Sequence, residues 1–207
     1  MMKAYKGFVL KGLTGGVLIG LAALVYSKAM ELGVGPFCAA LLFSFGLMAI
    51  IGLSANLYTG KAGYLWQDGL DSRDLAFRLY LNALGASLVG SIGIGDASIW
   101  AGKIAKPWYS VFGGAIGCGF LIFLAVEMSR RYGIRQTWAF VALCVISFIL
   151  AGFEHSIADI AYFGGYIVNS NSPLVGKSVG YLLLIVIGNL IGSLVAHWLA
   201  AITPKEY

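Results

Sequence analysis

The chain has 207 residues, of which 59% are hydrophobic and only 11% are charged, and its mean hydropathy is +0.86. Soluble domains carry about 25% charged residues, so this composition excludes an ordinary soluble protein and indicates that lipid surrounds most of the chain. The formal net charge of +5 is read as a sign of membrane orientation and not of nucleic-acid binding.

Six apolar stretches follow one another along the chain. A helix needs about 20 residues to cross the hydrocarbon core, so each stretch predicts a transmembrane helix. The expected spans are Gly7–Met30, Gly35–Leu65, Leu75–Ile94, Trp108–Met128, Trp138–Val168 and Val179–Ile202. The second and fifth are longer than one crossing requires and carry polar residues in the middle, so we expect both helices to be broken. The first is too long for a signal peptide and lacks its cleavage pattern.

The basic residues predict the orientation of the spans. With both termini in the cytoplasm, ten basic residues are cytoplasmic and four lie on the other side, which satisfies the positive-inside rule. The ten are Lys3, Lys6, Lys11, Lys61, Arg73, Arg78, Arg130, Arg131, Arg135 and Lys205, and the four are Lys28, Lys103, Lys106 and Lys177. We therefore expect a multi-pass protein of the cytoplasmic membrane.

Three weak similarities recur along the chain in the same order and at nearly one spacing. They match Gly15-Gly16 with Gly113-Gly114, Ala55–Thr59 with Gly152–Ser156, and Asn82–Ser87 with Asn189–Ser193. Two halves of three spans each, about 7–97 and 107–202, must enter the membrane from opposite sides. The sequence thus predicts an all-α membrane protein, a single channel domain over residues 1–207 with six transmembrane helices in two inverted three-helix repeats.

The segment Gly152–Ser156 places an acid and an imidazole inside an apolar span. Ionisable groups at this depth are costly and usually face a protein interior or a water-filled path. Non-helical backbone there must be buried or line a cavity, so Thr59 of the first break is predicted to face His155 of the second. Imidazole titrates nearest neutral pH, and His155 could pass a proton or donate a hydrogen bond. The plainer alternatives are a structural hydrogen bond for His155 and a bond from Thr59 back to its own helix.

Further candidates surround the two breaks. Glu154 cannot be buried as an unpaired anion, and Lys103, in the loop before the fourth span, is its natural partner. Asp159 is a second acid one turn beyond His155. Apolar candidates for the pore wall are Phe43, Leu47, Leu57, Tyr58 and Phe148, and polar ones are Asn56, Asn82 and Asn189.

Other chemistry has no pattern in the sequence. Cys38, Cys118 and Cys144 are isolated within spans and are expected to be small buried side chains. No enzyme signature, metal-ligand spacing or cofactor motif is present, so we expect neither an enzyme nor a cofactor.

These same residues carry a resemblance to the formate–nitrite transporter family, which covers nearly the whole chain. The most specific match is Ala151–Asp159, around the Glu-His-Ser motif, and the others are Leu57–Gly60, Leu124–Ser129 and Gly188–Gly192. The resemblance implies an aquaporin-like protomer within a homopentamer, with one pore in each protomer. It implies substrates that are small monovalent anions, namely formate, nitrite or hydrosulfide.

Carried over by position, the resemblance makes His155 and Thr59 the central pair of the pore and Lys103, in contact with Glu154, the lysine that attracts anions. Phe43, Leu47, Leu57, Tyr58 and Phe148 correspond to two apolar constrictions that bracket the pair. The chain departs from the family at Tyr58, where Phe is usual, at Asp159, where Asn is usual, and at Gly119, where some members carry Asn.

The expected function is passage of a small weak-acid anion, formate first, with or without a proton carried through His155. The sequence leaves open whether His155 protonates the anion or only donates a hydrogen bond to it. Two alternatives are a channel for a neutral solute such as water or ammonia and a membrane subunit that does not conduct. The Asn-Pro-Ala pair typical of aquaporins is absent from the sequence.

Overall fold

The computed structural model describes residues 2–67, 69–171 and 173–203, and within these ranges every regular element is a helix. Lys205, one of the basic residues used for the orientation, lies outside the described residues. The elements are α1 (Met2–Glu31), α2 (Pro36–Gly52), α3 (Tyr58–Lys61), the 3-10 helix η1 (Ala62–Tyr64), α4 (Ser72–Gly93), α5 (Ser98–Ala105), α6 (Trp108–Tyr132), α7 (Ile134–Leu150), α8 (Ser156–Asn169) and α9 (Val175–Ile202).

The outside of the molecule is apolar, as expected for a protein in lipid. By length and composition, α1, α4, α6 and α9 could each cross a membrane, and α2 and α7 are apolar but shorter. Large hydrophobic side chains are exposed on most helices, including four of the five tryptophans, Trp66, Trp108, Trp138 and Trp198. A soluble monomer rarely exposes so much continuous apolar surface.

Both predicted helix breaks are present, and they have the same backbone form. After α2, the N–H groups of Ser54 and Ala55 donate to the carbonyls of Ile51 and Ile50. After α7, those of Gly152 and Phe153 donate to Ile149 and Phe148 in the same pattern. This is a Schellman cap, which needs a left-handed residue; that residue is Gly152 (φ 67°) in the second break and, at greater conformational cost, Ser54 (φ 51°) in the first.

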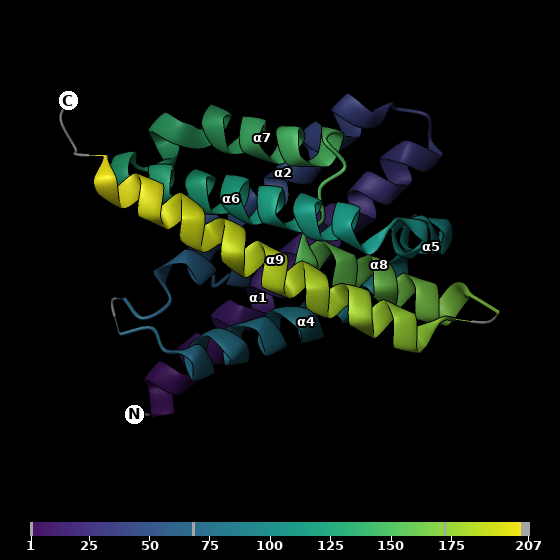
Figure 1. Ribbon diagram of the computed structural model, residues 1–207, viewed down its shortest axis with the longest axis horizontal. Coiled ribbons are helices and arrows are strands. Elements are labelled where there is room, and N and C mark those ends of the chain that lie inside the picture. Colours follow the sequence, from purple (N-terminus) through teal and green to yellow (C-terminus); the bar gives the residue numbers. More distant parts are fainter. Residues whose placement is uncertain (1, 68, 172, 204–207) are drawn as a thin grey trace.

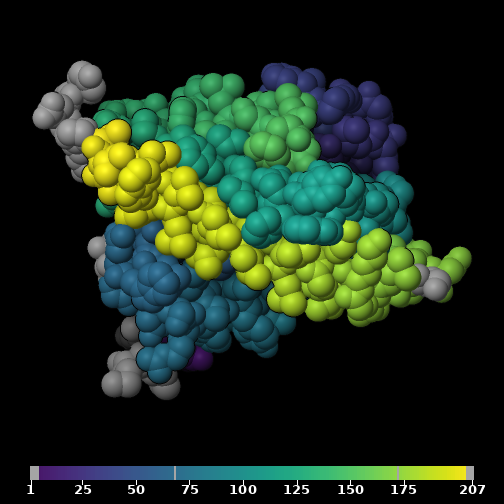
Figure 2. Space-filling model, in the orientation of Figure 1, coloured from purple at the N-terminus to yellow at the C-terminus, as the bar shows by residue number. Residues whose placement is uncertain are grey.

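The long helices pack in two close pairs, α1 with α4 and α6 with α9. Figure 1 shows α6 and α9 side by side across the molecule, and Figure 2 shows α9 crossing the surface beside α6. Glycines permit the close approach. A Cβ on Gly16 of α1 would lie 2.1 Å from the carbonyl oxygen of Asn82, and one on Gly119 of α6 would lie 2.1 Å from that of Asn189.

Three sequence-based expectations need correction. Lys103 is not in a loop but in α5, a short helix held down by the buried side chains of Trp100 and Ile104, with the Trp100 Nε1–H donating to Ser178 Oγ at 2.9 Å. Cys38 is exposed because it lies on the outward face of α2, whereas Cys118 and Cys144 are buried as expected. The first span is longer than predicted, since α1 continues through its polar N-terminal residues.

Candidate functional site

The two breaks meet at Thr59 and His155, as the sequence predicts. Thr59 Oγ1 lies 2.9 Å from His155 Nε2, and both side chains are buried. His155 Nδ1 accepts a hydrogen bond from the backbone N–H of Ala158 at 3.2 Å, which caps the start of α8. Because Nδ1 is an acceptor, the ring proton is on Nε2, and His155 is a neutral imidazole that donates to Thr59. The alternative of a Thr59 hydroxyl bonded to its own helix is not what the structure has.

Two of the predicted apolar residues pack at this pair. The Phe148 ring stacks on the His155 ring with centroids 5.9 Å apart, and Phe43 meets Phe148 edge-on at 6.0 Å. Leu47 and Leu57 are also buried. Tyr58 is one of the departures from the family pattern. Its hydroxyl donates a hydrogen bond to the carbonyl oxygen of Val186 in α9 at 3.0 Å.

Asn82 and Asn189 hold the two breaks in place. Asn82 accepts from the backbone N–H of Tyr58 (2.7 Å) and donates to the carbonyls of Gly12 and Asn56, both at 2.8 Å. Each side chain satisfies buried backbone groups that the broken helix leaves without partners.

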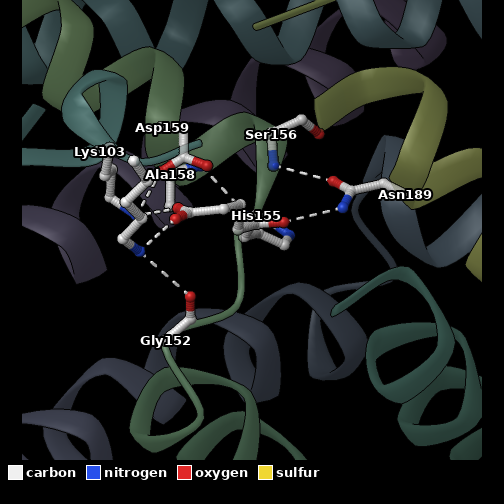
Figure 3. A network of polar contacts seen from close by, with 9 residues as sticks. Lys103, Gly152, His155, Ser156, Ala158, Asp159 and Asn189 are labelled. Carbon is white, nitrogen blue, oxygen red and sulfur yellow. Dashed lines mark hydrogen bonds and ion pairs between the residues drawn. The ribbon is translucent and has the colours of Figure 1, made fainter. Parts of the chain in front are cut away.

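Asn189 repeats this arrangement at the second break. It accepts from the N–H of Ser156 (2.9 Å) and donates to the carbonyls of Ala115 (2.8 Å) and Glu154 (2.9 Å). Figure 3 shows Asn189 bridging to this loop on the side opposite Lys103. All polar atoms of the two asparagine side chains are therefore engaged by backbone, and we assign both to the scaffold and not, as expected, to the pore wall.

The matching hydrogen bonds also correct the register of the internal similarity. Tyr58 corresponds to Ser156, and Asn56 to Glu154, because each pair meets its asparagine in the same way. His155 is therefore matched by Leu57 and not by Thr59. Likewise the partner of Gly16 is Gly119 and not Gly114, since Gly16 and Gly119 are the ones that touch the asparagine backbones.

One cavity, here called the α5 cavity, has a volume of about 350 Å³ and reaches His155 from the α5 side. Its wall includes Phe43 and Phe148 and two tyrosines from α1 and α8. The polar side chains that line it are Lys103, Lys106, His155, Asp159, Tyr26 and Tyr162. It is therefore an aromatic chamber whose charged groups gather at one place.

That place is a cluster of two lysines and two acids (Figure 3). Lys103 Nζ donates to Glu154 Oε2 and lies 2.9 Å from Asp159 Oδ1. Lys106 Nζ donates to the other oxygen of Glu154 at 2.7 Å. The predicted pairing of Glu154 with Lys103 is correct, and the full cluster holds two positive and two negative charges when every group is ionised.

A second cavity, here called the α3 cavity, has a volume of about 420 Å³ and lies at the first break. Leu57 and Asn56 line it, together with three basic side chains, Lys11, Lys61 and Arg130. The described residues that line it include no acid, although Glu127 lies beside it and binds Arg130 (2.8 Å) and Arg131 (2.6 Å).

The two cavities lie toward opposite ends of the same helices. On α1, Lys11 near the start lines the α3 cavity and Tyr26 near the end lines the α5 cavity. On α2, Ile50 lines the α3 cavity and Phe43 lines the α5 cavity. His155 lines the α5 cavity and Leu57 lines the α3 cavity, while the buried side chains of Thr59 and Leu47 line neither of the two.

Several members of the site were not expected. Lys106 was counted only as a charge outside the cytoplasm, yet it directly follows the last residue of α5, and its Nζ reaches Glu154. The basic wall of the α3 cavity was also missed, because Lys11, Lys61 and Arg130 belong to three separate helices. Among the described residues, no group of three His, Cys, Asp or Glu side chains lies together as a metal site would require.

Comparison with known proteins agrees with this architecture. The family model described as "Formate/nitrite transporter" matches residues 75–203. The nitrite transporter NirC of Escherichia coli (strain K12) is 23% identical over 228 aligned positions, which cover 96% of this chain and 84% of NirC. A probable formate transporter of Methanothermobacter thermautotrophicus is 25% identical over 187 positions, 72% of this chain and 68% of that protein.

Two solved structures share the fold. One, described as an FNT family ion channel, superposes with a TM-score of 0.84 at 23% identity and covers 98% of this chain and 92% of its own. The other, a pentameric formate channel with formate bound, gives a TM-score of 0.71 at 20% identity, over 96% of this chain and 95% of its own. With the family model matched over more than half of its length, the chain belongs to the formate/nitrite transporter family.

Proposed function

We propose that this protein passes small monovalent anions of weak acids across the cytoplasmic membrane, formate foremost and nitrite or hydrosulfide as further substrates. The observation that carries the proposal is the Thr59–His155 hydrogen bond, a buried polar pair that joins the two breaks, with a lysine-containing cavity at each break. The relatives named as nitrite and formate transporters support the same class of substrate.

The apolar enclosure of the pair determines the form in which a substrate can cross. Phe148 stacks on His155 and Phe43 packs on Phe148, Leu47 and Leu57 are also buried, and none of these side chains can replace the water that an ion would lose. Removing that water costs an anion far more than a neutral acid. A weak-acid anion can avoid this cost by accepting a proton, which an anion of a strong acid such as chloride cannot do.

His155 acts here as a hydrogen-bond donor. Its Nδ1 is committed to the Ala158 N–H, so the Nε2–H is the group that can turn from Thr59 to a substrate oxygen. Acting as a proton donor would require an imidazolium, and the ring would then lose its bond to Ala158 and the cap of α8. Of the two roles that the sequence left open, we therefore favour the hydrogen bond.

The rest of the architecture follows from the paired features of the two halves. We propose that residues 7–97 and 107–202 form inverted repeats with six spans in all, supported by the matched Schellman caps and the matched Asn82 and Asn189 bonds. The α5 cavity would face outward and the α3 cavity the cytoplasm, in line with the positive-inside rule. In Figure 1, α1 begins and α9 ends toward the same side of the molecule, which supports termini on one side of the membrane.

We also propose a homopentamer in which each protomer has its own pore. The support is the likeness to a solved formate channel described as pentameric. Large hydrophobic side chains are exposed on most helices and could contact lipid or neighbouring protomers.

The test is uptake of formate, nitrite and hydrosulfide into liposomes by the wild-type protein and by His155→Asn. Asparagine can still cap α8, but it is too short to reach Thr59. We expect formate flux to fall about tenfold or more, since a lost hydrogen bond to a buried polar group costs about 1–3 kcal/mol. His197→Asn is the matched control, because His197 bonds only Gln67 near the end of α9 among its described hydrogen bonds.

Equal flux through His155→Asn and wild type would remove His155 from the path. If the wild-type protein passed water or ammonia but none of the anions, the neutral-solute alternative would replace this proposal. Neither result would contradict the helical fold.

A further inference from the structure

Asp159 is a buried acid that the transport path described so far does not use. It is 1% exposed and lines the α5 cavity beside His155. Its Oδ1 lies 2.9 Å from Lys103 Nζ, but neither carboxylate oxygen has a well-aligned hydrogen bond among the described residues. A buried carboxylate without hydrogen bonds is costly, so this group needs either a ligand or a proton.

The two lysines near Asp159 donate their hydrogen bonds to the other acid of the cluster, Glu154. Lys103 and Lys106 both donate to Glu154, so Glu154 takes hydrogen bonds from both lysines while Asp159 has only the ion pair with Lys103. The titratable or charged groups facing Asp159 from the surrounding elements are Lys103 and Lys106 from α5 and its C-terminal end, Glu154 and His155 from the second break, Tyr162 from α8, Tyr26 from α1 and Cys118 from α6.

The charge of the cluster depends on the protonation of Asp159. With both acids ionised, the two lysines are balanced, and an arriving anion meets a carboxylate that repels it. With Asp159 protonated, the cluster has one positive charge in excess and an O–H group directed at the cavity. An anion held by Lys103 or Lys106 would then lie next to a proton that it can accept.

We propose that Asp159 is the residue that supplies the proton for transport of the weak-acid anion in the α5 cavity. Asp159 first takes a proton from the solution that fills the cavity. The anion then binds at the lysines, the O–H bond of Asp159 breaks, and an O–H bond forms on the substrate. The products are the Asp159 carboxylate, again paired with Lys103, and a neutral acid that crosses the section at Thr59 and His155.

This inference rests on the proposed function, and it assigns the proton to a different residue from the central histidine. His155 Nδ1 accepts from the Ala158 N–H, so the neutral ring has no second proton to give, whereas neither oxygen of Asp159 has a hydrogen bond among the described residues. The substrate class is the conjugate base of a small weak acid, such as a short carboxylate or nitrite.

The test compares formate flux in wild type, Asp159→Asn and Asp96→Asn at several external pH values. Asp96 is the control, because it is an acid just before α5 that contacts only the Ser98 N–H among its described bonds. We expect wild-type flux to rise as the external pH falls, by up to about tenfold per pH unit where one proton must bind. Asp96→Asn should follow the same curve.

Asp159→Asn should separate binding from transfer. The lysines then have an excess positive charge at every pH, so the apparent KM for formate at neutral pH should fall severalfold. The maximal flux at acid pH should fall about tenfold or more, because asparagine cannot supply the proton. A merely structural loss would not lower KM and maximal flux together. A maximal flux and a pH curve equal to those of wild type would overturn the proposal.

A second measurement does not depend on the variant. If a proton accompanies each anion, wild-type formate uptake is electroneutral and builds no membrane potential across the liposome. Uptake that builds a potential would overturn the role of Asp159 even if Asp159→Asn could not be purified. Absence of anion flux through wild type at every pH would instead contradict the proposed function itself.

Discussion

The two helix breaks have the same backbone and different side chains. Both follow a Schellman cap, and both are tied to an asparagine of a later helix by one accepted and two donated hydrogen bonds. At matched positions, however, the first break has Asn56 and Leu57 and the second has Glu154 and His155. The comparison indicates that the scaffold of a broken helix can be held constant while the chemistry at the break changes.

The difference in side chains gives the two cavities different electrostatics. At the first break, Leu57 closes an α3 cavity whose charged lining side chains are all basic. At the second, Glu154 is accompanied by Asp159, and the two acids balance Lys103 and Lys106. The charged side chains that line the α3 cavity are thus all of one sign, whereas the charge of the cluster at the second break depends on the protonation of Asp159.

The largest effect is expected when the balance at the second break is disturbed. Lys103→Met leaves Asp159 without its ion pair and Glu154 with one lysine, and breaking a buried pair costs about 3–5 kcal/mol. The midpoint of thermal unfolding in detergent should fall clearly, and adding Asp159→Asn should restore part of it. Lys11→Met, at an exposed side chain of the other cavity, should change the midpoint little. Equal effects of the two lysine variants would show that the cavities do not differ in this way.

The shared scaffold is tested next. Asn82→Ala and Asn189→Ala each remove three hydrogen bonds and leave a backbone N–H, that of Tyr58 or Ser156, buried without a partner. An unsatisfied buried donor costs about 1–3 kcal/mol, so both variants should lose a similar amount of stability. Heating followed by size-exclusion chromatography would measure it. A loss at only one asparagine would break the equivalence of the two halves.

The close packing of α6 against α9 gives the next prediction. Gly119→Ala puts a Cβ 2.1 Å from the Asn189 carbonyl oxygen, so α6 and α9 must separate, at a cost of about 1–3 kcal/mol. Gly113→Ala, on the same helix, meets no atom within 4 Å and serves as the control. The thermal midpoint of the first variant should fall and that of the second should not. A tolerated Gly119→Ala would mean that these helices can move apart freely.

The smallest effect is expected at the wall of the first break. Tyr58→Phe removes one hydroxyl, whose hydrogen bond to the Val186 carbonyl should contribute about 1 kcal/mol. Because the hydroxyl is bound to α9, formate flux should stay close to that of wild type while the thermal midpoint falls slightly. A large change in flux would place the Tyr58 hydroxyl in the path and not in the wall.

The sequence by itself determined the membrane class, the positions of both helix breaks and the pairing of Thr59 with His155. These depend on local composition: apolar runs of sufficient length and polar residues that interrupt them. That Glu154 needs a cation also followed from the sequence, since a buried acid requires one, and the family resemblance implied that the cation is Lys103. The family resemblance assigned the candidates Phe43 and Phe148 to a constriction; in the structure Phe148 stacks on His155, and Phe43 packs edge-on against Phe148.

Only the tertiary structure decided how the remaining polar residues are used. Asn82 and Asn189 were predicted for the pore, but they bond to backbone of helices far away in the chain. Lys106 and Asp159 belong to one cluster because α5 lies against the second break, which brings the lysines to the two acids. Hydropathy is a local property of the chain, whereas hydrogen bonds and ion pairs depend on which helices meet in space, and packing decides that.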